Sequence, residues 1–315
     1  MTPDTLRPAA QPTMYFVGVS TGSSAIHRVF AAWRPLLGLE RVDLVGIDIP
    51  VGAAPAAYRR VVEHLRDDAL SHGALVTTHK LDLYAAAHDL LAEVNDDATR
   101  LREISALVAR AGRIDGLALD TITSQLALEA IVTRLAGRDV LVMGAGGAAL
   151  ALCDYFAHRA GADAPGRVVV TDIADDRLAA VTAVTADVAT GNPAITWRTH
   201  RLDPGTAHDA LLTDLAPGAL VVNATGMGKD RPGSPLTDTA TFPAGGYAWE
   251  FNYRGELGFL RQARARAEPD RLIVSDGWRY FVHGWTRAID AVFQLGIPTS
   301  GPTFERLYES TLEVR

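Results

Sequence analysis

The sequence predicts an α/β protein of two domains, and three observations support this fold class. The chain has 315 residues, which is more than most single domains contain. Short apolar segments alternate with helix-forming segments along most of it, as in open sheets covered by helices. In the middle, the segment 139–159 joins an apolar run to a helix-forming run through a glycine-rich turn. We therefore predict two open α/β sheets rather than a barrel.

The first half of the chain is predicted to begin with a disordered arm, because residues 1–12 contain no apolar run. Hydrophobic periodicity then gives the following elements in chain order. We expect a strand at 13–19, a helix at 24–33 entered through Ser23, a strand at 43–47, a helix at 55–68, a strand at 74–77, helices at 81–94 and 97–105, and weak strands at 106–109 and 116–119.

The second half is built around the glycine-rich turn. Because each apolar run there is short and bounded by polar or turn residues, we interpret these runs as buried parallel strands. The elements expected are a helix at 122–135, strands at 140–143 and 167–171, a helix at 176–188, strands at 195–199, 219–222, 247–251 and 272–274, and a final helical part at 277–295.

Composition argues against several classes of protein. The net charge is −7, and no basic run suggests binding to nucleic acid. No apolar run approaches the length of a membrane span, so we expect a cytoplasmic protein. Cys153 is the single cysteine, which excludes an internal disulfide and a cysteine-based zinc site. His79 and His283 lack the spacing of metal ligands, so no metal is expected.

The glycine-rich turn predicts a dinucleotide site. The first glycine of such a turn allows a tight bend, the second allows a pyrophosphate to approach, and the helix that follows offers free N–H groups. Ala149 takes the place of the usual third glycine. The alternative is a strand-to-helix turn that binds nothing. The residues expected to contact the cofactor here are Gly144, Ala145, Gly146, Gly147 and Ala148.

Asp172 ends the next predicted strand, where the adenosine ribose of a dinucleotide would lie. A carboxylate there accepts hydrogen bonds from both ribose hydroxyls and repels a 2′-phosphate. The next arginine along the chain is Arg177. We therefore predict NAD as the cofactor, with NADP as the open alternative. The competing interpretation is that Asp172 only caps the following helix.

A second polar cluster ends the strand at 74–77, where Thr77, Thr78, His79 and Lys80 follow one another. Ligands of open α/β sheets bind beyond the carboxyl ends of the strands. A partly desolvated lysine near a carboxylate can move a proton at neutral pH. Taken alone, a lysine such as Lys80 at a strand end is more often a solvated charge, and Asp120 is interpreted first as the N-cap of the helix at 122–135.

In combination, these motifs resemble those of the shikimate dehydrogenase family along most of the chain. They occur in the family's order: TGSSAIH at 21–27, VTTHK at 76–80, Asp120, GAGGA at 144–148, NATGMG at 223–228, Asp-Gly at 276–277 and YFVH at 280–283. The lysine motif and GAGGA are the most specific of them.

The resemblance implies reversible oxidation of a ring hydroxyl to a ketone. Lys80 takes the position of the family's catalytic lysine, and Asp120 that of the carboxylate that holds it and binds a neighbouring hydroxyl. The family's substrate-binding positions fall on Thr21 and Ser23, which match the hydroxyls that hold the substrate carboxylate, and on Thr77, Ser105, Tyr280 and Gly284. Its cofactor-binding positions fall on the glycine-rich turn, Asn223, Ala224, Thr225 and Gly277, in addition to Asp172 inferred above.

The chain also departs from the family pattern in the substrate shell. Leu75 replaces an asparagine five residues before Lys80, and Ser105 replaces a second asparagine. Gly284 replaces a glutamine on the last helix, which removes an amide and adds space. The family's loop tyrosine falls near Asn252, or on Tyr253 after a shift of one residue. Shikimate itself is therefore a doubtful best substrate, and a quinate- or aminoshikimate-type compound fits equally well.

The sequence as a whole predicts an NAD-preferring dehydrogenase acting on a small cyclic polyhydroxy acid, as a monomer or homodimer. Two alternatives remain open: a methylene-tetrahydrofolate dehydrogenase/cyclohydrolase, for which we see no folate signature, and a non-catalytic NAD-binding sensor. The expected domains are a substrate domain at 1–120, a Rossmann dinucleotide-binding domain at 121–276, and C-terminal helices at 277–315 that return to the substrate domain. The substrate is expected in a cleft between the two domains, which closes on it.

Overall fold

The computed structural model describes residues 1–158, 160–186, 195–229 and 231–315. The chain forms two compact units. The first unit comprises Met1–Leu119 and Val282–Arg315, and the second comprises Asp120–Phe281. Helix α10 (Trp278–Phe293) begins in the second unit and continues into the first. The predicted two-domain α/β fold is confirmed.

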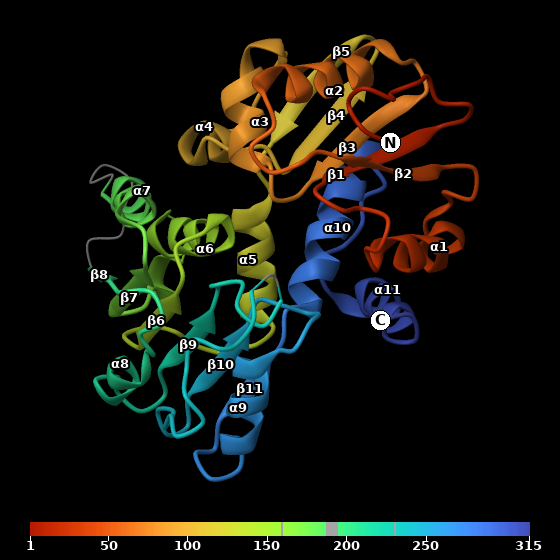
Figure 1. Cartoon of the computed structure of the whole chain (residues 1–315). Helices are drawn as coiled ribbons and strands as arrows, with labels where there is room; N and C mark the ends of the chain where they lie inside the picture. The colour runs from red at the N-terminus through yellow and green to blue at the C-terminus, as the bar shows by residue number, and fades with distance from the viewer. Residues whose placement is uncertain (159, 187–194, 230) are drawn as a thin grey trace. The chain divides into compact units, whose positions relative to one another are not determined.

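The first unit contains a five-stranded sheet and the helices that cover it (Figure 1). Besides its part of α10, its elements are β1 (Thr13–Gly18), α1 (Ile26–Leu37), β2 (Asp43–Asp48), α2 (Pro55–Asp67), β3 (Ser71–Val76), α3 (Lys80–Ala87), the short 3-10 helix η1 (His88–Leu90), α4 (Asp96–Leu101), β4 (Ala106–Arg110), β5 (Arg113–Leu117) and α11 (Gly301–Leu312).

The strand order of this sheet is β2-β1-β3-β4-β5. Strands β1, β2 and β3 are parallel, and every residue of β1 is buried, as expected for a central strand covered on both faces. Helix α10 packs on this sheet through Trp285, whose ring meets the ring of Phe16 edge-on at 5.2 Å between centroids. This arrangement places the carboxyl ends of the three parallel strands at one edge, where ligands of open sheets bind.

Strands β4 and β5 are antiparallel, which the sequence did not indicate. They form a hairpin in which Arg110 pairs with Arg113 and only two residues lie between them. Both turn residues, Ala111 and Gly112, have positive φ, the conformation of the two-residue turns that match strand twist. The second strand therefore begins at Arg113, three residues before the predicted segment 116–119.

Residues 1–12 differ from the disordered arm expected from their composition. The Met1 amine donates to the Gly46 carbonyl at 2.8 Å, and the Asp48 amide donates to the Met1 carbonyl at 2.8 Å. Further along, the Ala9 amide donates to the Asp68 carboxylate. Hydrogen bonds to the body of the unit thus hold a segment that has few apolar side chains of its own to bury.

The second unit contains a six-stranded parallel sheet of order β11-β10-β9-β6-β7-β8. Besides the start of α10, its elements are α5 (Asp120–Glu129), β6 (Asp139–Met143), α6 (Gly147–His158), η2 (Gly161–Asp163), β7 (Arg167–Asp172), α7 (Asp175–Thr185), β8 (Thr196–Arg201), α8 (Asp209–Thr213), β9 (Leu220–Asn223), β10 (Tyr247–Glu250), α9 (Gly258–Arg266) and β11 (Ile273–Ser275).

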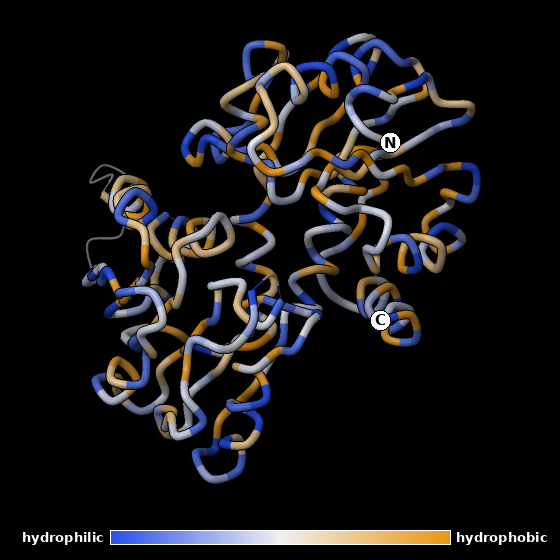
Figure 2. The backbone as a smooth tube through the Cα atoms, viewed as in Figure 1, coloured by the Kyte–Doolittle hydropathy of each residue, from blue (hydrophilic) through white to orange (hydrophobic). Residues whose placement is uncertain are grey.

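This strand order is that of a Rossmann fold, in which the order reverses between the first and fourth strands. Here β6 and β9 are those strands, and they pair directly, with Met143 opposite Asn223. The inner strands are largely apolar (Figure 2) and almost entirely buried, whereas the edge strand β8 is largely exposed. The reversal point is where dinucleotides bind in such sheets.

The predicted helices differ from the observed ones mainly at their C-terminal ends. Helix α4 ends at Leu101 because Arg102 takes a left-handed conformation, whereas the prediction extended to residue 105. Helix α5 ends at Glu129, not at residue 135. The last two residues of the helix predicted at 176–188 lie outside the described residues. Helices α8 and α9 were not predicted, and α11 was expected only as one of the C-terminal helices at 277–315, without bounds of its own. In the described part of the chain, no helix combines the length and apolar character needed to span a membrane.

Candidate active site

The glycine-rich turn lies directly after β6, at the reversal point of the second sheet. Gly144 has a φ of +94°, and a Cβ there would lie 2.6 Å from the Ala224 carbonyl oxygen, so only glycine fits. Its amide donates to the Thr171 carbonyl at 2.8 Å. A Cβ at Gly146, in contrast, would meet nothing within 4 Å, and α6 begins at the next residue. Close backbone packing on one side and open space on the other fit an approaching pyrophosphate.

Asp172 lies beside this turn and is nearly buried. Its Oδ2 accepts from the Ala145 amide at 2.7 Å, and its Oδ1 accepts from the Ala174 amide at 3.0 Å. Arg177 lies nearby, with Nη1 3.8 Å from Oδ2. The N-cap residue of α7 is Ala174, so Asp172 forms a turn before the helix and does not cap it. The carboxylate is instead tied to the glycine-rich turn.

Asn223 ends β9 and organises the segment that follows. Its Oδ1 accepts from both the amide and the hydroxyl of Thr225, at 3.1 and 2.7 Å. Its Nδ2 donates to Oε2 of Glu250 at 2.7 Å. The Oε1 of Glu250 accepts from the Asn252 amide at 2.9 Å. Asn223 and Thr225 are thereby fixed at the carboxyl end of β9, next to the glycine-rich turn that follows β6.

Glu250 is a site residue that we did not predict, although an acid inside the apolar strand 247–251 is a visible signal. It is fully buried at the end of β10. Burial raises its pKa from 4.5 to about 7, and the nearby Asp276 carboxylate adds to this rise, against the hydrogen bonds from Asn252 and Asn223. Its carboxyl group therefore titrates near neutral pH.

Gly277 and Tyr280 lie at the beginning of α10, within the second unit. A Cβ at Gly277 would lie 1.9 Å from the Phe251 carbonyl oxygen, which explains the glycine by close backbone approach. The ring of Tyr280 meets that of Phe251 edge-on at 5.0 Å. The ring of Tyr253 packs against Phe281 at 4.6 Å. The structure thus shows aromatic packing for Tyr280, and its substrate role stays a prediction.

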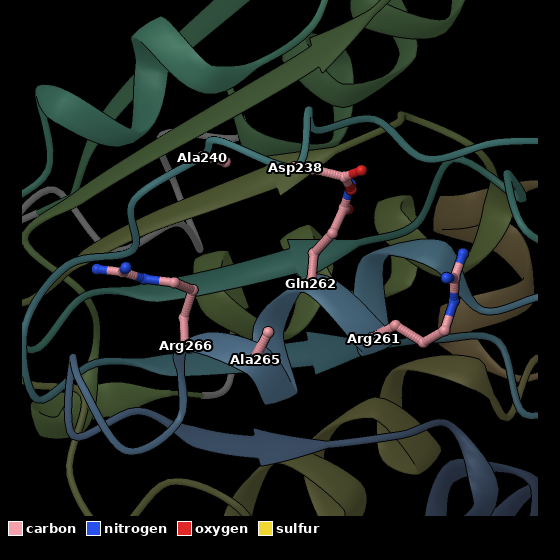
Figure 3. Close-up of a pocket in the computed structure, with 6 residues that line it drawn as sticks. All are labelled: Asp238, Ala240, Arg261, Gln262, Ala265 and Arg266. Atoms are coloured by element: carbon pink, nitrogen blue, oxygen red, sulfur yellow. The ribbon is translucent and has the colours of Figure 1, made fainter.

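A cavity of about 250 Å³ lies elsewhere in the second unit (Figure 3). Gln262 of α9 donates to Asp238 across it at 2.9 Å. None of the predicted site residues lines this cavity, so it contributes nothing to the candidate site. Its lining residues are Asp238, Ala240, Arg261, Gln262, Ala265 and Arg266.

In the first unit, Lys80 follows a tight turn at the carboxyl end of β3. The amide and hydroxyl of Thr77 both donate to the Val17 carbonyl, at 2.9 and 3.3 Å. Thr78 has a φ of +53°, which is uncommon for a β-branched residue, and the His79 amide donates back to the Thr77 carbonyl. Lys80 is then the first residue of α3 and is half-buried. Strained turns of this kind concentrate at functional sites.

His79 anchors this turn, a role that its position beside Lys80 did not reveal. Its side chain is buried, and Nε2 donates to the Ile49 carbonyl at 2.8 Å. The Tyr58 hydroxyl lies 3.2 Å from Nδ1 of His79 and donates to Oδ2 of Asp82 at 3.3 Å. Burial and the neighbouring Asp82 carboxylate raise the pKa of Tyr58 to about 12, so the phenol stays protonated.

Thr21 makes contacts that its predicted role did not include. Its amide and its hydroxyl both donate to Oδ1 of Asp48, each at 2.7 Å. The Thr21 side chain is almost fully buried, whereas Ser23 is exposed. The N-cap of α1 is Ala25, so the helix does not begin through Ser23 as expected from the sequence. Asp48 is a further residue that we did not predict.

The side chain of Ser105 forms hydrogen bonds with the protein's own backbone. Its hydroxyl accepts from the Leu119 amide at 2.6 Å and donates to the Leu117 carbonyl at 3.3 Å. The preceding Ile104 amide donates to the Lys80 carbonyl at 3.1 Å. Residues 104–105 thus hold both the beginning of α3 and the residue that precedes Asp120. This geometry supports a positioning role for Ser105, and its substrate contact stays a prediction.

We expect Ser105→Ala to destabilise the protein by about 1–3 kcal/mol, because the partly buried Leu119 amide loses its acceptor. Urea unfolding measures the change. Ser310→Ala is the matched control in the same unit, since the Ser310 hydroxyl only donates to a carbonyl of its own helix. The control should change stability by less than about 0.5 kcal/mol. Equal effects of the two substitutions would refute the positioning role.

The remaining predicted residues lie in different units. Asp120 is the buried first residue of α5 and opens the second unit. The hydroxyl of Thr121 beside it donates to Asp154 of α6 at 2.8 Å, which anchors this end of α5. Gly284 lies on α10, within the first unit. Among the described residues, no group of three His, Cys, Asp or Glu side chains is arranged to hold a metal ion.

The fold and these turns define a two-domain α/β protein with a Rossmann unit, and comparisons with known proteins identify its relatives. No family model matches the chain. The chain is 32% identical over 208 residues to shikimate dehydrogenase (NADP(+)) of Symbiobacterium thermophilum, a match that covers 62% of this chain and 63% of that protein. The chain is thus similar to a shikimate dehydrogenase over this span, and the resemblance seen in its motifs is confirmed. The match spans less than two thirds of that relative's length.

Two solved structures share the fold over almost their whole length. Shikimate 5-dehydrogenase of Thermus thermophilus, solved with NADP(H) and shikimate, has a TM-score of 0.70 and 22% identity, over 96% of this chain and 99% of that one. Quinate dehydrogenase of Corynebacterium glutamicum, solved with NAD, has a TM-score of 0.71 and 20% identity, over 96% of this chain and 99% of that one. These likenesses establish the fold.

Proposed function

We propose that this protein is an NAD(P)-dependent dehydrogenase that reversibly oxidises a hydroxyl group of a small cyclic polyol of the shikimate and quinate type. The observation that carries the proposal is the placement of the motif residues at the carboxyl ends of parallel strands. The glycine-rich turn follows β6 and Asn223 ends β9 at the reversal point of one sheet. The Thr77–Lys80 turn follows β3 of the other sheet.

Lys80 is proposed to accept the proton of the reacting hydroxyl and to return it in the reverse direction. The turn before Lys80 is fixed by Thr77 and His79, so its backbone needs little rearrangement when a substrate binds. Asp120 is proposed to hold the Lys80 ammonium and a neighbouring substrate hydroxyl, as the family resemblance implies. A nicotinamide cofactor, when bound, accepts the hydride.

The dinucleotide is proposed to bind at the reversal point of the second sheet. The open space at Gly146 and the beginning of α6 fit its pyrophosphate, and Asn223, Ala224 and Thr225 are proposed to line the nicotinamide side. Asp172, fixed by the Ala145 amide, is proposed to bind the ribose and so to favour NAD. The curated relative carries NADP in its name, so the preference needs its own test.

We expect Asp172→Ser to raise the ratio of kcat/KM for NADP to that for NAD by at least about tenfold, which corresponds to about 1.4 kcal/mol. The substitution removes a charge that would repel a 2′-phosphate and leaves Arg177 beside the site. The matched control is Asp175→Ser, because Asp175 is exposed and pairs with Arg201 at the surface. An unchanged ratio in Asp172→Ser would contradict the assignment.

The experiment that tests the function is the change in absorbance of the nicotinamide on adding substrate. The purified chain would be assayed with NAD or NADP against shikimate, quinate, and their amino and deoxy analogues. Steady reduction with any of these compounds supports the proposal. Dinucleotide binding without turnover of any of them would refute it and favour the non-catalytic sensor. A test with methylene-tetrahydrofolate separates the remaining alternative.

A further inference from the structure

The Thr21 hydroxyl and the Asp48 carboxylate beside it leave hydrogen-bond acceptors, and no donor, for a ligand. Thr21 directs both of its donors, the amide and the hydroxyl, at Oδ1 of Asp48. This arrangement is built into the strand beside it, because a Cβ at Gly46 would lie 1.9 Å from the Thr21 hydroxyl oxygen. The glycine in β2 therefore makes the space in which Thr21 faces Asp48.

The amides at the beginning of α1 are also used within the chain. The Ser24 amide donates to the Thr21 carbonyl at 3.1 Å, and the His27 amide donates to the Ser24 carbonyl at 3.3 Å. The Ile26 amide donates to the Ser24 hydroxyl at 3.4 Å. A helix N-terminus usually attracts an anion through its free N–H groups, and at these positions those groups already have acceptors.

Asp48 itself is half-buried and keeps an oxygen for a ligand. Within the described part of the chain, no hydrogen bond reaches its Oδ2 and no lysine or arginine pairs with it. Because the Thr21 hydroxyl donates its hydrogen bond to Asp48, only the lone pairs of its oxygen remain for a ligand. Asp48 and Thr21 together present acceptors and a negative charge, which attract a hydrogen-bond donor and repel a carboxylate.

We propose that Asp48 makes this subsite specific for a neutral hydroxyl group, so that the substrate presents no carboxylate beside Thr21. A hydroxyl is the donor that a polyol offers, and it pairs with the carboxylate without bringing a second anion to it. This inference rests on the proposed function and changes its substrate class at one position. It also assigns Asp48 a role that the motifs did not reveal, because the aspartate lies outside all of them.

The test compares three compounds with one ring: shikimate, the analogue with the carboxylate reduced to a hydroxymethyl group, and the analogue with an aminomethyl group. In the full chain with its cofactor, we expect kcat/KM for the hydroxymethyl compound to exceed that for shikimate by at least about tenfold. In Asp48→Asn this ratio should fall by about tenfold or more, because the charge is gone while an oxygen remains for Thr21. Dissociation constants of the three compounds, measured by calorimetry, compare their affinities without requiring turnover.

Asp43→Asn is the matched control, because Asp43 is also half-buried and lies at the other end of β2, about 16 Å away. In Asp43→Asn, the ratio of kcat/KM for the hydroxymethyl compound to that for shikimate should equal the ratio of the unaltered chain. A preference for shikimate, or a ratio that Asp48→Asn leaves unchanged, overturns the inference, and turnover of shikimate would then leave the proposed function standing. A preference for the aminomethyl compound overturns the proposed specificity for a neutral hydroxyl and shows that the subsite selects a cation. If none of the three compounds binds, the inference fails, and the proposed function is then decided separately by the assay with quinate and its analogues.

Discussion

Lys80→Met should lower kcat by roughly 10²–10⁴-fold, the contribution of a positioned acid or base. Methionine keeps the length of the side chain at the beginning of α3 but cannot exchange a proton. Lys80→Arg should lose a comparable factor, because arginine is not deprotonated in proteins. Dinucleotide affinity should stay unchanged, since the glycine-rich turn belongs to the other unit. Steady-state kinetics on the best substrate, together with a fluorescence titration of NAD, measures both quantities.

The chain offers a matched control for this prediction. Of its 30 lysine and arginine residues, only Lys80 and Lys229 are lysines. Lys229→Met removes the other amine and should change kcat by less than about threefold. Full turnover in Lys80→Met would contradict the proposed mechanism. The scarcity of lysine is itself a sequence signal, because a chain that otherwise uses arginine keeps a deprotonatable side chain at the end of β3.

The second large effect is expected on the pH dependence of stability, through Glu250. Its pKa is raised from 4.5 to about 7 in the folded protein, so the folded state binds this proton more tightly than the unfolded state. Stability from this group is therefore fully present below about pH 4.5 and is lost as the pH rises through 7. A shift of this size corresponds to a change on the order of 3 kcal/mol.

Urea unfolding of the unaltered chain and of Glu250→Gln, from about pH 4.5 to about pH 8, tests this expectation. Glutamine does not titrate, so the free energy of unfolding of the variant should rise relative to that of the unaltered chain as the pH increases. Glu256→Gln, at an exposed residue a few positions along the chain, should show no such trend. A constant difference between Glu250→Gln and the unaltered chain would show that Glu250 titrates normally.

The features that the sequence predicted are those set by neighbouring residues. The turn at Gly144 needs a positive φ and a close approach to the Ala224 backbone. A glycine at this point of the sequence indicates both requirements. The inner strands are apolar because both faces of a parallel sheet are covered. Lys80 was found at the carboxyl end of β3 because strand ends can be located from apolar runs alone.

The features that it did not predict depend on partners far apart in the chain. Thr21 and Asp48 are 27 residues apart and meet only because β1 pairs with β2. Ser105 meets Leu119 only because β4 and β5 form a hairpin, and nothing in the motif around Ser105 indicates this pairing. Helix ends such as Arg102 depend on a single left-handed residue, which the periodicity of side chains does not record.

The two edges of the parallel sheet in the second unit end in different ways. Strand β11 has only three residues, too short a backbone edge to recruit another strand. Strand β8 has six, but it carries Arg198, His200 and Arg201 and is exposed along nearly its whole length. A second copy that added a strand there would bring like charges together. The sheet therefore resists edge-to-edge self-association by shortness on one side and by charge on the other.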